Sequence, residues 1–376
     1  MKICLLTPAL PPKMDGIGDY TARMAVTLSS DHTVSILYCD QNACPTPIEN
    51  IPVSKGYVFE NPKSVLNVGT LAKEFSPDWL IVQYNPFSYG RRGFNPYLPA
   101  MVKNIQKQGI RVGVMVHEPY VPVLDWKNAV MTTYQRWQLR GMVKQADAVF
   151  VSGEAWKSYI QNWTNGKTIT HLPVGSNIPF HVVDRSEARE WSGISQNTFT
   201  VGLFGSNHIS LQNSFTVNAV KRMLEKGMPV QVVYIGAHGK DLKAQFQEIP
   251  FLDLGKLDAE MVSTGLACMD MFATSFIDGI STRRTTVMAA LEHGIPILGT
   301  KGHHTDSIFI QENNHSLILA DAHNSAEFAE KALMIAESDK IRSTIGPNGS
   351  ALFQKNFQPC ALKSILISGL EAAYEL

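Results

Sequence analysis

Short apolar runs alternate with stretches of helical periodicity along almost the whole chain. In the first half, runs rich in Val, Ile and Leu predict strands at 2–6, 33–38, 79–82, 112–116, 148–152 and 168–172. Between them, stretches such as 20–28, 96–108 and 129–145 space their apolar residues by three and four and predict helices. Strands that are apolar at nearly every position are typical of a parallel sheet covered on both faces. Joined by helical crossovers, they predict a doubly wound sheet.

The pattern stops and then restarts near residue 198. Residues 174–197 are polar and turn-rich, and they predict a linker. Further strands are predicted at 198–204, 230–235, 251–254, 271–274, 296–299 and 316–319, and terminal helices at 325–337, 341–357 and 360–374. We therefore expect an α/β protein of two Rossmann-like doubly wound domains in tandem. The domains are 1–180 and 198–358, and a C-terminal helix, 359–376, packs on the first of them.

Composition and charge exclude several classes of protein to which this chain could belong. The 376 residues are 44% hydrophobic and 18% charged, which excludes a disordered chain. The 33 basic and 33 acidic residues balance, so charge does not predict a nucleic-acid partner. Residues 1–183 nevertheless hold 17 basic and 12 acidic residues, an excess that suits an anionic ligand or surface. Five scattered cysteines, no signal peptide and no long apolar run predict a cytoplasmic protein without structural zinc.

Candidate chemistry lies where the predicted strands end, because ligands of open parallel sheets bind at that edge. The loop 14–20 follows the first strand, and Gly16 and Gly18 would let backbone N–H groups approach an anion. A plain strand–helix turn explains these glycines equally well. His117 ends the strand 112–116, where it would contact a sugar hydroxyl or a phosphate. A buried structural histidine is the alternative.

The segment 274–296 carries the most informative pattern. A strand ends near Thr274, a polar loop follows, and a helix is expected from Arg283 with Ser281 or Thr282 as its N-cap. Two arginines, Arg283 and Arg284, in a first helical turn oppose the usual preference for acids there. With the hydroxyls and the free N–H groups they would bind a diphosphate. A solvated basic turn is the alternative.

Two other features are weaker candidates. His303, His304 and Asp306 resemble metal ligands, but adjacent histidines point in different directions, so we expect no metal site. Trp137 lies within the basic stretch 136–144, which predicts either contact with an anionic membrane surface or an ordinary amphipathic helix.

Taken together, these loops resemble the GT-B-fold glycosyltransferases, in particular the large retaining family 4 group, over nearly the whole chain. The resemblance rests on Gly16-Ile17-Gly18, His117-Glu118, the stretch 146–152, Phe204-Gly205 and the run from Asp278 to Pro296. It implies two domains facing a cleft and a metal-free hexosyltransferase (EC 2.4) that acts with retention. A nucleotide-diphosphate sugar would be its co-substrate, with no further cofactor. The implied setting is bacterial polysaccharide or glycoconjugate biosynthesis.

The sequence departs from that family at two places. Family members carry two glutamates eight residues apart, where this chain has Ser281 and Ala289; Asp278 would take over the first role. The family's basic pair after the glycine turn of the second domain is missing, and Arg283 and Arg284 would supply its charge. The resemblance then implies His117, Asp278 and Arg284 as catalytic residues. It implies a donor-binding set of Gly16, Gly18, Gly205, Ser206, Asn207, Ser281, Thr282, Arg283 and Thr285.

The first domain is expected to bind an unidentified acceptor. Its aromatic residues would stack on sugar rings, and its arginines would meet a phosphate or anionic head groups. The residues concerned are Asp19, Tyr84, Arg91, Arg92, Glu118 and Tyr120. Gap-filling aromatics and solvated arginines are the alternative. Two other functions stay open, a nucleotide-sugar 2-epimerase of the same fold and a catalytically silent homologue that binds a sugar nucleotide.

Overall fold

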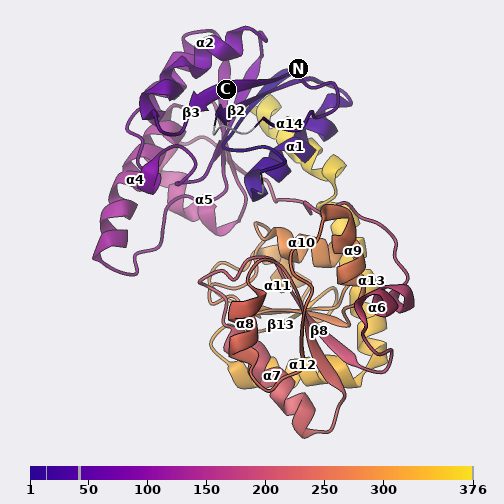
Figure 1. The fold of residues 1–376 in the computed structure, drawn as a ribbon. Coiled ribbons are helices and arrows are strands. Elements are labelled where there is room, and N and C mark those ends of the chain that lie inside the picture. The colour runs from indigo at the N-terminus through magenta and orange to yellow at the C-terminus, as the bar shows by residue number, and fades with distance from the viewer. Residues whose placement is uncertain (14, 41–43, 375–376) are drawn as a thin grey trace. The chain divides into compact units, whose positions relative to one another are not determined.

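The computed structural model describes residues 1–13, 15–40 and 44–374, and it divides the chain into two compact α/β units (Figure 1). The first unit is Met1–Val174 together with Pro359–Leu376, and the second is Gly175–Gln358. The C-terminal helix α14 (Pro359–Ala372) packs on α1 (Gly16–Ser29), beside which Figure 1 shows it in yellow. An ion pair links Lys363 of α14 to Asp31, which lies two residues after the end of α1.

The first unit is built on a parallel sheet with the strand order β3-β2-β1-β4-β5-β6-β7. Its strands are β1 (Lys2–Thr7), β2 (Thr33–Asp40), β3 (Val53–Val58), β4 (Trp79–Tyr84), β5 (Arg111–Val116), β6 (Ala148–Val151) and β7 (Ile169–His171). Besides α1 and α14, its helices are α2 (Val68–Lys73), α3 (Leu98–Gln106), α4 (Trp126–Gln145) and α5 (Ala155–Ile160). Short 3₁₀ turns are η1 (Pro62–Asn67), η2 (Arg91–Gly93) and η3 (Gln161–Trp163).

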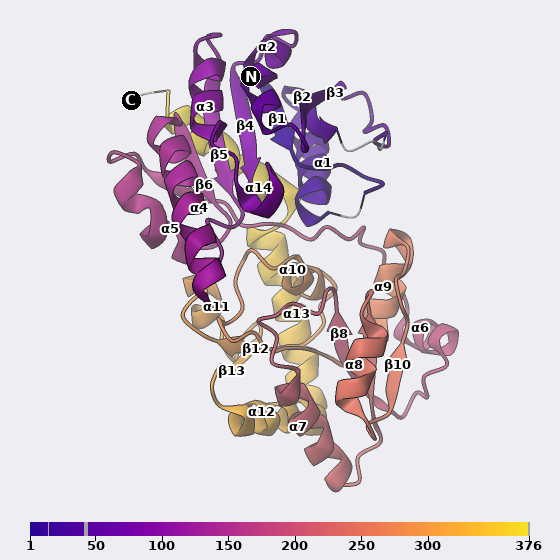
Figure 2. The ribbon, with the colours of Figure 1, turned by 60° about the vertical axis from the view of Figure 1, so that its left-hand side comes forward.

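Helices cover both faces of this sheet because successive strand residues point to opposite sides. Leu6, Val82 and Val114 belong to one buried cluster with the apolar residues of α3 and α4. Phe150 points to the other face, where Gly369 of α14 lies against its ring. Figure 2 shows α3 and α14 on opposite sides of β4 and β5. A doubly wound sheet with two covered faces is therefore confirmed for this unit.

The second unit repeats the plan with the parallel order β10-β9-β8-β11-β12-β13. Its strands are β8 (Phe199–Phe204), β9 (Val230–Ile235), β10 (Phe251–Asp253), β11 (Met271–Thr274), β12 (Ile297–Lys301) and β13 (Ile318–Asp321). Its helices are α6 (Arg185–Ser192), α7 (Asn213–Glu225), α8 (Gly239–Phe246), α9 (Ala259–Ala267), α10 (Thr285–Glu292), α11 (Ser307–Gln311), α12 (Ser325–Glu337) and α13 (Asp339–Asn356). Among the described residues, no helix is long and apolar enough to cross a bilayer.

Each sheet has one point where the order of its strands reverses. In the first unit the chain runs outward from β1 through β2 to β3 and then returns to β4, on the other side of β1. In the second unit the reversal lies between β8 and β11. The loops after the two strands that flank such a point diverge and leave a crevice at the carboxyl edge of the sheet. These two edges are where the fold favours ligand sites.

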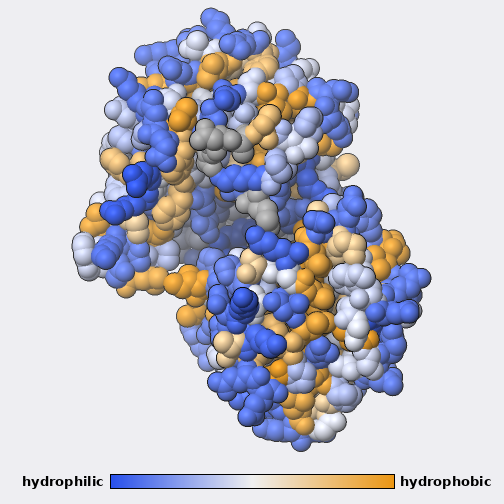
Figure 3. All heavy atoms as spheres, viewed as in Figure 1, coloured by the Kyte–Doolittle hydropathy of each residue, from blue (hydrophilic) through white to orange (hydrophobic). Residues whose placement is uncertain are grey.

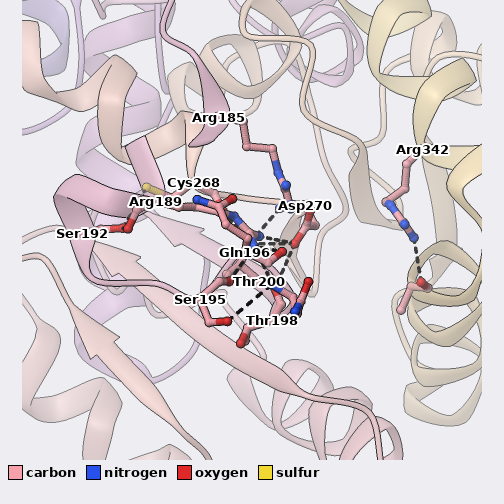
Figure 4. Close-up of polar contacts among 12 residues, drawn as sticks. Arg185, Arg189, Ser192, Ser195, Gln196, Thr198, Thr200, Cys268, Asp270 and Arg342 are labelled. Carbon is pink, nitrogen blue, oxygen red and sulfur yellow. Dashed lines mark hydrogen bonds and ion pairs between the residues drawn. The ribbon is translucent and has the colours of Figure 1, made fainter. Parts of the chain in front are cut away.

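The predicted linker 174–197 contains a helix, α6, and the structure divides the chain at 174/175. Asp184 caps α6 by accepting from the amides of Ser186 and Glu187, and Gly193 ends it with a left-handed backbone. Arg189 is fully buried and anchors the helix to the sheet (Figure 4). Its guanidinium donates to Asp270 at 2.6 Å and to the carbonyl of Thr198 at 2.9 Å. The helix carries mostly polar residues, so its sequence lacks the apolar periodicity that predicts helices.

Candidate functional site

Three loops of the second unit meet at the carboxyl end of β11, next to the reversal point of its sheet. The loop after β8 touches α10, since a Cβ at Gly205 would lie 2.7 Å from Thr286. The same loop accepts a hydrogen bond of 2.9 Å from the amide of Ile277 at the carbonyl of Ser210. The loop after β12 joins through the amide of His304, which donates to the carbonyl of Asp278 at 2.9 Å. The fold thus brings Gly205 and Asp278, 73 residues apart in sequence, to one edge.

A charged cluster occupies this edge. Asp278 is buried, and its Oδ2 lies 2.8 Å from Arg283, 3.2 Å from Arg284 and 3.3 Å from Nδ1 of His304. Burial raises the pKa of the Asp278 carboxyl, but the His304 hydrogen bond and the charges of Arg284 and Arg283 outweigh it and hold the pKa well below its usual value. Two guanidiniums thus share one ionised carboxylate, and these three side chains carry a net positive charge.

Arg284 is held in place from three sides. Its guanidinium lies 3.8 Å from the centre of the Phe276 ring and 3.3 Å from Oγ of Ser210, besides its contact with Asp278. Its side chain is about 10% exposed, as is that of Arg283. The backbone of Arg284 is extended, with φ −93° and ψ 98°, so α10 begins at Thr285. The prediction of a helix from Arg283 with Ser281 or Thr282 as N-cap is therefore wrong.

The hydroxyl residues ahead of the arginines have different environments. Thr282 is fully buried, and its amide and Oγ1 donate to Oδ2 of Asp306 at 2.6 and 2.5 Å. Ser281 is only 2% exposed, and its Oγ has no hydrogen-bond partner among the described residues. Gly279 has a φ of +85°, and a Cβ there would lie 2.4 Å from the amide of Gly302, so only glycine fits. Within the described residues, no cluster of three His, Cys, Asp or Glu is placed to hold a metal ion.

A cavity of about 480 Å³ opens at the carboxyl ends of β9 and β10, beside the Gly205 loop. Tyr234 connects the two, because its hydroxyl donates to the carbonyl of Gly205 at 2.7 Å and accepts from the amide of His238 at 3.1 Å. The lining includes both basic and acidic side chains together with three glycines; the residues are Gly236, Ala237, His238, Gly239, Lys240, Asp241, Asp253, Gly255 and Lys256. Its volume lies within the range of small-molecule sites.

His117 follows β5 in the first unit and is buried. Its Nε2 lies 2.8 Å from Oε1 of Gln83 on β4, and its ring meets Tyr20 of α1 edge-on at 5.2 Å. Burial lowers the pKa of His117 to about 3. The ring is therefore neutral at physiological pH, and its Nε2 donates to the glutamine oxygen. A neutral histidine in this position acts as a hydrogen-bonding group and carries no charge.

The buried His117 should make stability depend on pH. Its pKa is about 3 when folded and about 6.5 when unfolded, so the unfolded chain binds the proton more tightly and stability falls as the pH drops from 6.5 toward 3. Between pH 8 and pH 5 this group should cost about 2 kcal/mol of unfolding free energy. Urea titrations at both pH values measure the loss, which should be smaller in His117→Asn. An equal loss in that variant and in a control, His181→Asn at an exposed position, would contradict the assignment.

The two-unit architecture was compared with known proteins and known structures. No protein-family model matches the sequence, and no curated protein matches it. A sucrose-phosphate synthase from Thermosynechococcus elongatus superposes with a TM-score of 0.76 at 12% identity, covering 100% of this chain and 99% of that one. HepE of Anabaena, in complex with UDP and glucose, superposes with a TM-score of 0.74 at 15% identity, covering 99% and 100%. The chain has the GT-B fold.

A protein described with a different activity, an epimerase, also has this fold. A protein from Listeria monocytogenes described as a UDP-N-acetylglucosamine 2-epimerase superposes with a TM-score of 0.62 at 12% identity, covering 100% of this chain and 96% of that one. The resemblance seen in the sequence is therefore confirmed for the fold.

The glycine loop of the first unit has an internal partner. Oδ1 of Asp15, the residue before α1, accepts from the amides of Ile17 and Gly18 at 3.0 and 2.8 Å. The sequence predicted an external anion for these amides. Gly18 is required for packing, because a Cβ there would lie 2.8 Å from the carbonyl oxygen of Ala9, while the space around Gly16 is open. Met14 of this loop lies outside the described residues.

The predicted acceptor residues of the GT-B fold's first unit are scattered. Tyr84 is fully buried against Tyr89, so its prediction as a stacking surface is wrong; it ends a central strand, whose side chains lie inside the core. Tyr120 is half-buried and stacks on Tyr159, at 6.1 Å between ring centres. The other four lie near loops: Asp19 in the first turn of α1, Arg91 and Arg92 exposed on η2, and Glu118, which accepts a hydrogen bond of 3.3 Å from Asn85.

A second cavity lies at the reversal point of the first sheet, among the loops after β1 and β4. It measures about 570 Å³, and Lys13, Asp15, Asp40, Glu60 and Asn85 are among the residues that line it. Three carboxylates and one lysine give this lining an acidic character. Arg91 and Arg92, which were expected to meet an acceptor phosphate, are not part of it.

Four residues in and around the charged cluster were not predicted to take part in it: His304, Asp306, Phe276 and Ser210. His304 and Asp306 were weighed only as metal ligands, whereas they hydrogen-bond Asp278 and Thr282. The signal available was their position directly after β12, at the same sheet edge as the loop after β11.

Two residues predicted to bind the donor lie in the loop after β8. Ser206 is exposed, and Asn207 accepts a hydrogen bond of 3.0 Å from Asn213.

Proposed function

We propose that this protein is a glycosyltransferase that transfers a sugar from a nucleotide-diphosphate donor, and that its second unit binds the donor. The observation that carries the proposal is the arginine pair at the reversal point of the second sheet. Arg283 and Arg284 are nearly buried, and both contact the carboxylate of Asp278 at the sheet edge where this fold favours ligands. Two guanidiniums held close together at such an edge present positive charge and several N–H donors to a ligand. A diphosphate has the charge and the oxygen geometry that guanidiniums bind best.

The same arrangement suits the chemistry of transfer. As the bond between the anomeric carbon and the diphosphate oxygen breaks, negative charge accumulates on the leaving diphosphate. Fixed guanidiniums stabilise that charge most when they are already oriented, and Phe276, Ser210 and Asp278 orient Arg284. The start of α10 adds to this, because the side chain of its N-cap residue, Arg284, does not cap the first amides. The hydroxyl of Ser281 adds a further donor, which has no partner among the described residues.

Two cavities support a division of roles. The cavity of about 480 Å³ beside the Gly205 loop has room for the nucleoside of the donor. The cavity of about 570 Å³ in the first unit would take the acceptor, and its acidic lining favours an acceptor rich in hydroxyl groups over an anionic one. His117 would contact the transferred sugar as a neutral hydrogen-bonding group. Retention of configuration, independence from metal and membership of the family 4 group are parts of this proposal.

The choice of nucleotide can be tested directly by ligand-induced stabilisation. Because HepE was crystallised with UDP, this nucleotide should be tried first, beside GDP and dTDP. At about 100 times its Kd, the right nucleoside diphosphate should raise the free energy of unfolding by roughly 2.7 kcal/mol. Thermal unfolding with each nucleotide, and with the matching nucleoside, measures the response. We expect the diphosphate to stabilise much more than the nucleoside.

A matched pair of variants assigns the response to the arginines. The double variant Arg283→Gln/Arg284→Gln should lose most of the diphosphate response and keep that of the nucleoside. Arg222→Gln, on the exposed face of α7, should respond as the wild type does. The proposal fails if no nucleoside diphosphate stabilises the wild type, or if the double variant responds unchanged.

The same fold leaves a second candidate, a nucleotide-sugar 2-epimerase, which the likeness to the Listeria monocytogenes protein favours. Epimerisation needs no acceptor, so incubation of nucleotide sugars with the protein alone separates the two activities. A third candidate, a silent homologue that only binds the sugar nucleotide, follows from Ser281 and Ala289 at the positions of the family's glutamates. Any transfer or hydrolysis above background eliminates it.

A further inference from the structure

The segment that begins α4 exposes an unusual amount of apolar surface. Seven large apolar side chains of the described residues are more than half exposed, and five of these lie between positions 123 and 137. They are Val123, Leu124, Trp126, Val130 and Trp137. Figure 3 shows orange side chains among blue ones at the surface of the region that Figure 1 labels α4. We call these five residues the apolar patch.

The part of α4 from Trp126 to Gln138 is built with its polarity inverted. Its buried residues are polar, and they bind loop backbone: Gln138 donates to the carbonyl of Gly93 at 2.8 Å, and Gln135 accepts from the amide of Val121 at 2.9 Å. Thr132, also buried, donates to the carbonyl of Val121 at 2.7 Å. A helix in water normally buries its apolar stripe and exposes its polar one. This inversion breaks that local rule, and such departures mark functional surfaces.

The outward face of α4 forms one stripe with two halves. At about 100° per residue, Trp126, Val130 and Trp137 fall within about 40° of one another around the helix. Arg140 and Lys144 continue the stripe toward the C-terminal end, both exposed. The helix carries four basic residues and no acidic one, the other two being Lys127 and Arg136. The stripe therefore joins tryptophans to positive charge along about 27 Å.

We propose that this face of α4 is a docking surface for an anionic lipid bilayer. Tryptophan rings beside apolar side chains insert at the boundary of head groups and acyl chains, and lysine and arginine beside them bind anionic head groups. A second copy of the chain fits less well, because two such helices would set four positive charges against four. An acidic protein partner would match the charge and leave the tryptophan-rich half without a lipid-like environment. The proposal does not depend on the transferase activity.

Vesicle binding tests the proposal with the full chain. Wild-type protein is sedimented with vesicles of phosphatidylcholine alone and with vesicles holding about 30% phosphatidylglycerol. We expect binding to the anionic vesicles to be at least about tenfold stronger and to fall with added salt. Phosphatidylglycerol vesicles made with brominated acyl chains should also quench the tryptophan fluorescence, which reports insertion of the rings.

Matched variants locate the surface. Trp126→Ser/Trp137→Ser should lose at least about tenfold in binding and most of the quenching, whereas Trp191→Ser, at an exposed tryptophan of α6, should change neither. Arg140→Gln/Lys144→Gln should lose the preference for anionic vesicles, whereas Lys221→Gln/Lys340→Gln, at exposed positions of the second unit, should keep it. All substituted side chains are exposed, and thermal unfolding checks that each variant is folded.

Three outcomes overturn the proposal: wild-type protein that binds neither vesicle, equal binding to neutral and anionic vesicles, or equal losses in the α4 variants and their controls. The first outcome would leave an acidic protein as the better occupant of the face.

Discussion

Replacing Arg284 by glutamine should lower kcat/KM for sugar transfer by about 10²–10³. The expected loss is that of one preorganised donor to a developing anion, and it follows from the geometry of the cluster. The guanidinium of Arg284 is fixed by its contacts with the Phe276 ring and with Asp278. Glutamine is shorter and uncharged, so it cannot replace this positive charge. Because the charge grows as the diphosphate leaves, kcat should fall more than KM rises. Steady-state kinetics with the donor identified by thermal unfolding measures both.

Comparison variants show whether the effect belongs to the cluster. Arg283→Gln should show a loss of the same order, since its guanidinium lies 2.8 Å from the same carboxylate. Because the two arginines act on one group, the double variant should lose less than the product of the single losses. Arg222→Gln should keep wild-type kinetics. Near-wild-type turnover in both single variants would show that the diphosphate is stabilised elsewhere.

Replacing Arg189 by methionine should destabilise the second unit by about 3–5 kcal/mol, without touching the proposed site. Arg189 is fully buried, and its loss removes a buried cationic partner of Asp270, whose carboxylate also binds the amide of Thr200 at 2.7 Å. It also leaves the carbonyl of Thr198 without this donor. The large cost arises because the remaining cation beside Asp270, Arg185, is about half exposed and compensates the carboxylate less well than a buried partner does. Urea unfolding monitored by circular dichroism measures it.

The neighbouring Arg185 provides a control on the same helix. It contacts the same carboxylate, but its side chain is 47% exposed, so Arg185→Met should cost about 1 kcal/mol or less. Equal costs for the two substitutions would mean that burial does not set the strength of this network. At the melting temperature, the Arg189 variant should unfold roughly 6–20 °C lower than the wild type.

The strands beside the two reversal points could be predicted because the apolar pattern that marks each strand lies within the strand itself. β1, β4, β8 and β11 are short runs of apolar residues, and their burial on both faces requires just such a pattern. The edge strand β3 escaped prediction because Ser54, Lys55 and Gly56 interrupt its apolar residues. The helix α6 escaped for the same reason, because its anchoring residue is an arginine.

Most residues of the proposed donor site could be named from sequence because strand ends in a doubly wound fold face one edge. Asp278, Arg283 and Arg284 follow β11 directly, so their shared position needed no knowledge of other loops. Tyr84 shows the limit of this argument. It ends β4 as expected, but alternation along the strand directs its side chain into the core, where Tyr89 covers it.

The sequence by itself determined the α/β class, the two doubly wound units and the strand ends that hold the candidate residues, because periodicity and turn residues act within a few positions of the chain. Only the tertiary structure decided which loops meet. It paired Asp278 with His304, 26 residues away, engaged Asp306 with Thr282, and left the apolar patch exposed. Each of these depends on packing and electrostatics between segments distant in sequence, where burial and partner geometry outweigh local preference.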